Sequence, residues 1–209
     1  MEKQGLLFIV SAPSGAGKTS LCKGIIKQVP NLAYSVSFTT RPPRPGEIHG
    51  QDYFFVDVPT FQAHIDKNDF IEWSEVHGNL YGTSRELLMS QTERGMDVLL
   101  DIDSQGAMTL KKKHGEGVYI YILPPSFDVL RQRLMERKSD APEEITRRLQ
   151  RAREEIWSYR QYYYLVVNRE YGDAIKELEA VILAERIKSR RIDLAWIEEA
   201  FIKRLGKDV

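Results

Sequence analysis

The sequence is poor in the residues that mark secreted, zinc-binding and membrane proteins. Among its 209 residues Cys22 is the only cysteine, so no intramolecular disulfide is possible and a reducing, cytoplasmic location is expected. The four histidines are scattered without the spacing of metal ligands. The longest apolar stretches, such as Leu6–Val10 and Val98–Leu100, are far too short to cross a bilayer. The N-terminal apolar run enters a glycine-rich segment and not a cleavage site, so we expect no signal peptide.

An excess of charge of one sign is also missing, because Lys and Arg together number 30, as do Asp and Glu. A balanced chain produces no overall field that favours nucleic acid or an anionic membrane surface. We therefore expect neither as a partner, and any anion-binding site must come from basic residues that cluster locally. The sequence leaves open whether the chain is a monomer or a homo-oligomer.

Short apolar runs rich in β-forming residues alternate with helical patterns along most of the chain. This alternation predicts an α/β fold in which a parallel sheet core is flanked by helices. The predicted buried strands are Leu6–Val10, Asp97–Ile102, Val118–Leu123 and Tyr164–Asn168. The predicted helices lie at about Lys18–Gln28, Phe127–Arg137, Glu143–Tyr159 and Asp173–Ser189.

Two segments depart from this alternation. Between about Ser35 and Thr83, aromatic β-rich runs are separated by turn residues, which favours a small mixed lobe with antiparallel strands. From Lys188 to Val209 the apolar residues recur at roughly helical spacing. Packing of this tail on the core and packing on a partner subunit are both compatible with the pattern.

The segment Ser11–Ser20 predicts a phosphate-binding loop. It matches the Walker A pattern, except that Ala12 stands at the first glycine. The amides and dipole of the helix that starts near Gly17 would face the anion, and Lys18 would reach the β- and γ-phosphates. The Thr19 hydroxyl is placed to bind Mg²⁺. A glycine-rich turn with an incidental lysine is the alternative, but the loop follows a predicted strand and opens a predicted helix, as the motif requires. The expected ATP-binding residues of the loop are Ser11, Ala12, Pro13, Ser14, Gly15, Ala16, Gly17, Lys18, Thr19 and Ser20.

A carboxylate, Asp101, follows the apolar run Val98–Leu100 near the end of the predicted strand Asp97–Ile102. An apolar strand with a terminal aspartate is the Walker B form, which holds Mg²⁺ in P-loop proteins. Ligands of open α/β sheets bind at the carboxyl ends of the strands, where both motifs occur. We therefore expect Thr19 and Asp101 to hold the metal, and we expect loss of Lys18 to lower turnover with little effect on folding.

Arginines are concentrated in two places. Arg137 and Arg148 belong to a basic stretch that is able to close over ATP as a lid and neutralise the transferring phosphoryl group. For most arginines of that stretch, a solvated helix surface is the alternative, because glutamates interleave. Arg41 and Arg44 lie on a proline-stiffened loop that suits a bidentate grip on a phosphate monoester. A cationic surface turn is the alternative there.

Six segments, taken in order, resemble the guanylate kinase family: SAPSGAGKTSL, SFTTRPPRPGE, GQDYFF, FIEW, YGTS and LLDIDSQGA. The resemblance runs from about Leu6 to Arg186. It implies transfer of the γ-phosphoryl group of ATP to GMP with Mg²⁺, giving ADP and GDP, in purine nucleotide metabolism. It also implies the nucleoside monophosphate kinase fold in a single domain. The implied parts are a core of 1–34, 85–135 and 149–187, a GMP-binding lobe of 35–84, a lid of 136–148 and a helical tail of 188–209.

The resemblance assigns roles to individual residues. The implied ligands of the GMP phosphate are Arg41, Arg44, Tyr53 and Tyr81, and those around the base are Ser37, Glu72, Thr83 and Asp103. The implied catalytic residues are Lys18, Arg41, Arg137 and Arg148, and Asn168 is expected near the adenine of ATP. The chemistry of guanine agrees, because its ring N–H and exocyclic amine both donate to one carboxylate, and Glu72 supplies one.

Two other functions are compatible with parts of the sequence. A kinase of the same scaffold with a phosphorylated ribose as acceptor would have no use for a guanine-binding carboxylate such as Glu72. A non-enzymatic binding module, like the guanylate-kinase-like domains of scaffolding proteins, tends to have a degraded phosphate loop. The intact Gly17-Lys18-Thr19 favours catalysis.

Overall fold

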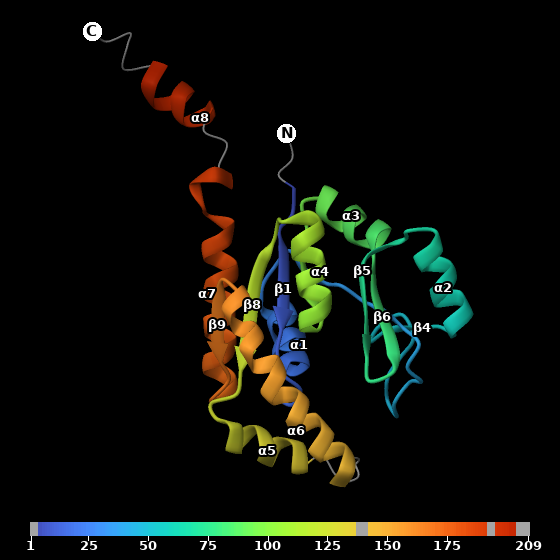
Figure 1. The fold of residues 1–209 in the computed structure, drawn as a ribbon. Helices are drawn as coiled ribbons and strands as arrows, with labels where there is room; N and C mark the ends of the chain where they lie inside the picture. Colours follow the sequence, from blue (N-terminus) through green and yellow to red (C-terminus); the bar gives the residue numbers. More distant parts are fainter. Residues whose placement is uncertain (1–3, 137–141, 192–194, 204–209) are drawn as a thin grey trace.

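The computed structural model describes residues 4–136, 142–191 and 195–203 of the chain. Five parallel strands form a central sheet in the order β2-β7-β1-β8-β9. These strands are β1 (Leu7–Ser11), β2 (Leu32–Tyr34), β7 (Asp97–Asp101), β8 (Val118–Leu123) and β9 (Tyr164–Val167). Helices lie on both faces of this sheet (Figure 1), which confirms the predicted α/β architecture.

The four predicted strands are all present, with ends within one residue of the prediction. Strand β2, Leu32–Tyr34, was not predicted, because three residues are too few to show a period. In the sheet, Val10 pairs with Asp101 across β1 and β7. This register places the start of the predicted phosphate-binding loop beside the predicted magnesium ligand.

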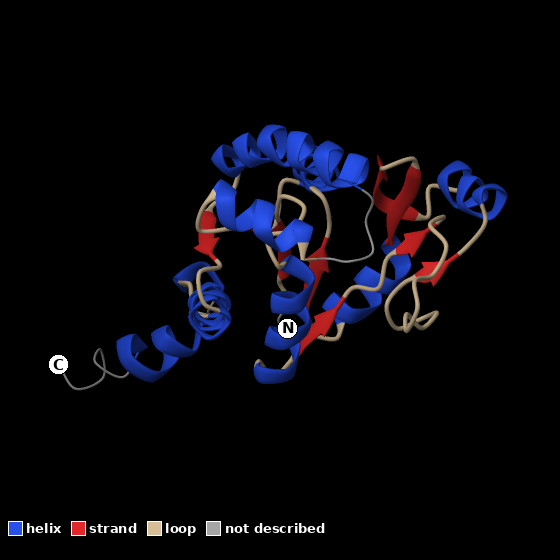
Figure 2. Cartoon of the chain, turned by 90° about the horizontal axis from the view of Figure 1, so that it is seen from below, coloured by secondary structure: helices blue, strands red, loops and turns tan. Residues whose placement is uncertain are grey.

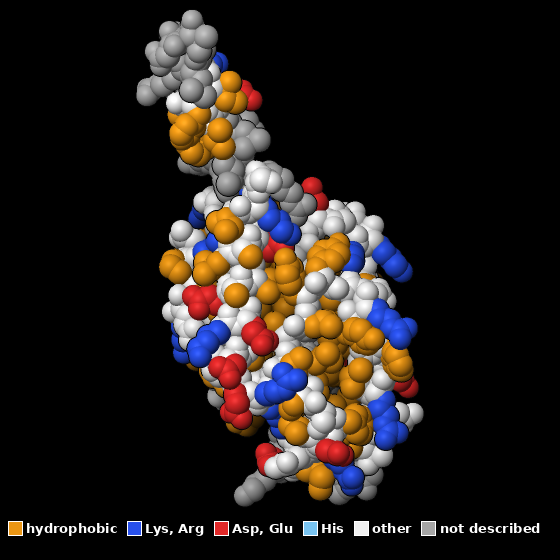
Figure 3. Space-filling view, turned by 90° about the vertical axis from the view of Figure 1, so that its left-hand side faces the viewer, with side chains coloured by type: hydrophobic (Ala, Val, Ile, Leu, Met, Phe, Trp, Pro, Cys, Tyr) orange, Lys and Arg blue, Asp and Glu red, His pale blue; other side chains and the backbone are white. Residues whose placement is uncertain are grey.

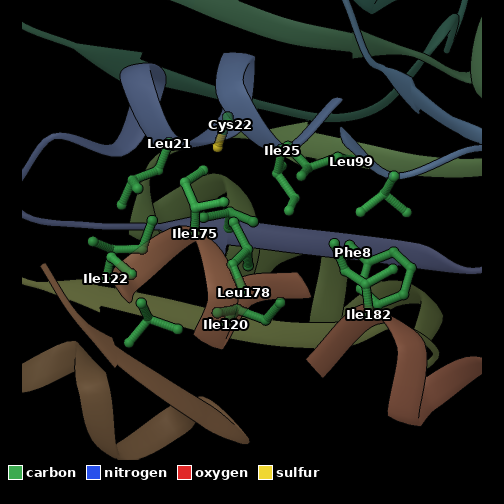
Figure 4. Close-up of a cluster of buried hydrophobic side chains, with 14 of the residues drawn as sticks. Phe8, Leu21, Cys22, Ile25, Leu99, Ile120, Ile122, Ile175, Leu178 and Ile182 are labelled. Carbon is green, nitrogen blue, oxygen red and sulfur yellow. The ribbon is translucent and has the colours of Figure 1, made fainter. Parts of the chain in front are cut away.

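Alternate residues of each central strand point to opposite faces of the sheet, as the two-residue period of a strand requires. On one face, Phe8, Leu99 and Ile120 pack against the helices α1 (Lys18–Gln28) and α7 (Tyr171–Arg186). Figure 4 shows side chains of this cluster, with Leu21 and Ile25 from α1 and Leu178 and Ile182 from α7. On the other face, the buried cluster draws on α3 (Arg85–Glu93) and α4 (Ser104–His114). The two clusters hold α1 and α4 rigidly at the ends of β1 and β7.

The small lobe has its own sheet, in the order β4-β3-β6-β5. Its elements are β3 (Phe38–Thr39), β4 (Phe54–Phe55), α2 (Val58–Asp66), β5 (Phe70–Val76) and β6 (Asn79–Ser84). Strands β5 and β6 form an antiparallel hairpin whose two turn residues, His77 and Gly78, both have positive φ, as tight hairpin turns require. Figure 2 shows this second sheet beside the central one. The mixed lobe with antiparallel strands is therefore confirmed.

Beyond β8 the chain forms two helices, α5 (Phe127–Met135) and α6 (Pro142–Ile156), joined by residues outside the described part. Leu130 and Leu134 of α5 pack against Ala152 of α6. Helix α6 continues into a 3₁₀ turn, Trp157–Gln161. The predicted site residue Arg137 lies outside the described residues.

Near the C-terminus, the short 3₁₀ turn Ser189–Arg191 precedes helical residues at α8 (Ala195–Ile197) and Glu198–Ile202. Figure 3 shows apolar side chains on this segment, where Trp196 and Phe201 are exposed. Among the residues that the structure describes, no helix is both long and apolar enough to span a membrane.

Candidate active site

The loop between β1 and α1 has the backbone of an anion-binding loop. Gly15 and Gly17 adopt φ of 93° and 92°, which side-chain-bearing residues rarely adopt. The N–H groups of Gly15 and Gly17 donate to no other described residue, whereas the N–H of Ala16 donates to the carbonyl of Pro13 at 3.1 Å. The loop therefore offers inner amides at the N-terminus of α1, whose first turn has no acidic side chain.

Two residues from distant elements fix the shape of this loop. The side-chain amide of Asn168, at the end of β9, donates to the Ala16 carbonyl at 2.8 Å. Arg133 of α5 donates to the backbone carbonyl of Asn168 at 3.0 Å. Asn168, expected near the adenine, thus contacts the loop backbone in this structure, and its role toward adenine stays a prediction.

Replacement of Gly17 by alanine is expected to weaken ATP binding at least about tenfold, because the loop must move. A Cβ at Gly17 would lie 2.5 Å from Nδ2 of Asn168, on a backbone with positive φ. Titration of ATP measures the effect. Gly115→Ala is the matched control, because Gly115 also has positive φ and nothing lies within 4 Å of its Cβ position. Equal ATP affinity in both variants would contradict the role of the loop.

Lys18 is held by an ion pair at the end of β7. Its Nζ lies 2.8 Å from Oδ1 of Asp101 and donates to the carbonyl of Ile102 at 2.6 Å. Tyr34 of β2 donates to the other oxygen of Asp101 at 3.1 Å. Burial alone would lower the pKa of Lys18, but attraction to Asp101 outweighs it and raises the pKa, so the ammonium stays charged.

Helix α6 contacts the outer part of the loop through two side chains. Arg148 donates to the Ser14 hydroxyl from Nε at 3.0 Å and from Nη2 at 2.8 Å. The N–H of Ser14 donates to Oε2 of Glu155 at 3.1 Å. Burial raises the pKa of Glu155 above its ordinary value. The structure therefore brings Arg148 to the loop, together with the Glu155 carboxylate, which no sequence motif singled out.

A second cavity, of about 170 Å³, opens on the other side of Lys18 between the small lobe and the strand end. Its lining includes the predicted residues Ser37, Tyr53, Glu72, Tyr81 and Asp103. Thr83 does not line it, but its hydroxyl donates to Oε1 of Glu72 at 2.5 Å. With Arg41, whose guanidinium lies near the Tyr53 ring, seven of the eight predicted GMP-binding residues either line this cavity or contact a lining residue. The exception is Arg44.

Glu72 is a buried carboxyl group, only 2% exposed. Burial is the main cause that raises its pKa to about 7, and the nearby Asp103 adds to it. Gly106 of α4 makes room for this carboxyl, because a Cβ at Gly106 would lie 2.4 Å from Oε2 of Glu72. Asp103 caps α4 through the N–H groups of Gln105 and Gly106, and it also accepts a hydrogen bond from Ser74 at 2.5 Å. The two carboxyl groups are thus fixed side by side.

The two loop arginines, Arg41 and Arg44, have different surroundings. Arg41 places Nη2 2.8 Å and 2.9 Å from the two oxygens of Glu47, and its guanidinium lies 5.3 Å from the centre of the Tyr53 ring. Because Tyr53 lines the second cavity, this contact ties Arg41 to it. The Arg44 side chain is exposed, and its backbone N–H donates to Glu47 at 2.7 Å. The structure thus brings Arg41 to the cavity edge and does not bring Arg44 there.

The cavity at the loop has a volume of about 220 Å³. It shares Lys18, Thr19, Val76 and Asp103 with the second cavity, so the two adjoin. A larger hollow of about 700 Å³ lies elsewhere, lined by Leu6, Tyr163, Glu185 and others, and holds none of the predicted site residues. The two adjoining cavities are the candidate active site, because the predicted phosphate loop and the buried carboxyl groups converge there.

Oxygen ligands suited to Mg²⁺ are present where the two cavities adjoin. The exposed Thr19 and the Asp101 carboxylate both line the second cavity. A hydroxyl and a carboxylate are hard donors, and Mg²⁺ binds few protein ligands because it retains several waters. Among the described residues there is no cluster of three or more His, Cys, Asp or Glu side chains able to hold a metal. The donor set thus fits a nucleotide-bound Mg²⁺ better than a metal held by the protein alone.

Several contacting residues were missed by sequence reasoning. Glu47 lies within the quoted SFTTRPPRPGE segment, six residues after Arg41, so its charge could have suggested the pair. Tyr34, Ser74 and Glu155 gave no such signal, because each contacts a partner at least 29 residues away in the sequence. Arg133 belongs to the basic stretch that the sequence indicated, but its contact with Asn168, 35 residues away, was not expected.

Comparison with known proteins agrees with this geometry. The family model for guanylate kinase matches residues 4–185. The guanylate kinase of Geobacter sulfurreducens is 53% identical over 201 residues, which cover 96% of this chain and 98% of that protein. The guanylate kinase of Thermotoga maritima is 42% identical over 90% of this chain and 91% of its own. The crystal structure of guanylate kinase from Anaplasma phagocytophilum superposes with a TM-score of 0.80, at 30% identity and 97% coverage of both chains. The chain described here therefore belongs to the guanylate kinase family.

Proposed function

We propose that the two adjoining cavities hold ATP and GMP for the guanylate kinase reaction, in which the γ-phosphoryl group of ATP passes to GMP and gives ADP and GDP. The observation that carries the proposal is that both cavities share Lys18 and Thr19. A donor phosphate on the loop and an acceptor phosphate beside Tyr53 would then meet at one ammonium group. Such proximity is the main requirement of phosphoryl transfer.

On the donor side, the amides of the loop and of the first turn of α1 bind the ATP phosphates. Lys18 reaches the β- and γ-phosphates, and Arg148 neutralises charge on the transferring group. Arg137 has the same proposed role. Thr19, with Asp101 acting directly or through water, would hold Mg²⁺, which supplies additional positive charge to the phosphates when bound.

On the acceptor side, Glu72 accepts hydrogen bonds from the ring N–H and the exocyclic amine of guanine. Asp103, Ser37 and Thr83 complete the contacts around the base. The phosphate of GMP is bound by Arg41, Arg44, Tyr53 and Tyr81. To reach it, Arg41 gives up its present contact with Glu47. No general base is needed, since the attacking phosphate oxygen is already anionic near neutral pH.

Each part of the proposed mechanism corresponds to a range of residues. We propose a core of 1–34, 85–135 and 149–187, a GMP-binding lobe of 35–84, a lid of 136–148 and a tail of 188–209. Two separate sheets support the division between core and lobe. We also propose a cytoplasmic location, because a single cysteine suits a reducing compartment that contains nucleotides.

A coupled assay of ADP release tests the substrate. With ATP and Mg²⁺ present, we expect rapid turnover with GMP and turnover lower by about 10³-fold or more with AMP, CMP, UMP or ribose 5-phosphate. Comparable rates with AMP would remove Glu72 from the base site. Binding of GMP without turnover would instead indicate a non-enzymatic module.

The affinity for GMP is expected to fall as the pH falls, because Glu72 becomes protonated. Since the pKa of Glu72 is about 7, the carboxylate form that guanine requires is lost as pH falls through that value. At pH 6 we expect GMP binding about tenfold weaker than its plateau at higher pH. The GMP phosphate also titrates near this range, so the control is Glu72→Gln, whose profile contains the phosphate titration alone. Identical profiles for the two proteins would contradict the assignment.

A further inference from the structure

Glu155 lies at the C-terminal end of α6, and hydrogen bonds hold both its main chain and its side chain. The hydroxyl of Tyr121, a fully buried residue of β8, donates to the Glu155 carbonyl at 2.6 Å. The side chain accepts the N–H of Ser14 in the phosphate loop at 3.1 Å. Figure 1 shows α6 running from the lid end of the molecule back toward the sheet. Glu155 is therefore fixed between the central sheet and the loop, at the end of the helix that carries Arg148.

Helix α6 places one positive and one negative side chain in contact with Ser14 of the loop. Arg148 and Glu155 are seven residues apart, which is about two helical turns, so they share a face of α6. Arg148 contacts the hydroxyl of Ser14, and Glu155 contacts its backbone amide. Both side chains line the cavity at the loop. One of them attracts an incoming phosphate, and the other repels it.

The phosphate nearest to Ser14 is expected to be the terminal one. The amides at the start of α1 are expected to bind the α- and β-phosphates, and Lys18 reaches toward the γ-phosphate. Ser14 lies in the outer part of the loop, in contact with the arginine proposed to neutralise the transferring group. A γ-phosphoryl group would thus approach the amide to which the Glu155 carboxylate is bonded.

We propose that Glu155 is a positioning residue that competes with the terminal phosphoryl group of ATP for the Ser14 amide, and so lowers the affinity of the site for ATP relative to ADP. This inference rests on the proposed function, because it assigns the loop to the donor nucleotide. Competition arises because one N–H cannot serve two anionic acceptors at full strength, and because two anions in one small cavity repel each other. ADP has no terminal group at this position, so it leaves the Glu155 contact intact.

The dissociation constants of ATP and ADP test the proposed role of Glu155. We would titrate wild type, Glu155→Gln and Glu154→Gln with ATP–Mg²⁺ and with ADP–Mg²⁺, without GMP, by calorimetry. Glu155→Gln retains an oxygen acceptor but loses the charge, and it leaves the main-chain bond with Tyr121 in place. We expect it to bind ATP roughly three- to tenfold more tightly, with ADP affinity changed less than about twofold. Glu154 is exposed, so its variant controls for removal of one negative charge from the same helix.

Other results would overturn the inference. Equal tightening for ATP and ADP would show a general charge effect, and weaker ATP binding would show that Glu155 supports the nucleotide. No change in either constant would also overturn it. If Glu155→Gln fails to fold, Glu155→Ala is expected to raise the ATP-to-ADP affinity ratio as well, since it removes the competing acceptor altogether. A wild-type protein that binds no ATP would instead refute the proposed function, so the two failures are distinguishable.

Discussion

Replacement of Lys18 by alanine is expected to lower kcat by about 10²–10³-fold, the usual cost of removing one group that stabilises charge in the transition state. Lys18 lies where the proposed donor and acceptor cavities adjoin, and the proposed function has its ammonium serve both phosphates. A coupled assay with saturating ATP and GMP measures the loss. Activity within about threefold of wild type would contradict the assignment of Lys18.

The structure changes the expectation for stability, because the sequence alone suggested that loss of Lys18 has little effect on folding. Asp101 pairs with Lys18 at 2.8 Å, and its side chain is only 4% exposed. Removal of one partner of a buried ion pair leaves an uncompensated charge, so Lys18→Ala is expected to lose about 1–3 kcal/mol of stability. The double variant Lys18→Ala, Asp101→Asn is the control: it should recover much of that stability while staying inactive. Recovery of activity in the double variant would show that Lys18 acts only through folding.

Replacement of Glu72 by glutamine is expected to lower kcat/KM for GMP by about 10²–10³-fold, with the Kd for ATP changed less than twofold. The amide of glutamine presents one acceptor where guanine needs two, and its NH₂ group faces a donor of the base. Steady-state kinetics with GMP and titration with ATP separate the two effects. Unchanged GMP kinetics would remove Glu72 from the acceptor site.

The thermal stability of this variant distinguishes a lost contact from a damaged fold. Burial raises the pKa of Glu72 to about 7, above its unfolded value, so ionisation of Glu72 opposes folding as pH rises through 7. At pH 8 the Glu72→Gln protein is therefore expected to unfold at a temperature no lower than wild type. Glu75→Gln is the matched control, because it removes the same charge from an exposed position on the same strand.

The groups proposed to bind phosphate share one arrangement in this structure. Lys18 is paired with Asp101, Arg41 with Glu47, and the Ser14 amide with Glu155. Each carboxylate holds a cationic or donor group close to the position that the proposed function requires. Such ordering lowers the entropy that must be lost when substrates bind. The carboxylates also oppose phosphate binding, and the Glu155 experiment measures that opposition at one of the three pairs.

The local patterns of the sequence predicted the parts of the site whose residues are neighbours in the chain. Helix α1 begins and ends at the predicted residues, Lys18 and Gln28, because a glycine loop and Pro30 bound it. Only the resemblance to a family singled out Glu72 from other acids on strands. Both features depend on short segments, which sequence patterns describe well.

The contacts that the sequence could not predict join distant segments. Ser14 and Glu155 are 141 residues apart, and Tyr34 and Asp101 are 67 residues apart. Only the packing of α6 and β2 on the sheet brings these partners together. Arg148 was expected to approach phosphates, but nothing in its spacing revealed that Glu155, on the same helix face, would reach the same loop residue.

The proposed function requires that a donor site on the phosphate loop and an acceptor site beside Glu72 meet at Lys18 and exclude water between them. Phosphorus NMR of wild-type protein with ATP, GMP and Mg²⁺ tests it directly, because it follows every phosphoryl group at once. We predict that ADP and GDP appear at equal rates and that inorganic phosphate stays below a few per cent of the ADP formed. Inorganic phosphate formed in step with ADP, with GMP unconsumed, would show that the two sites do not meet in this way.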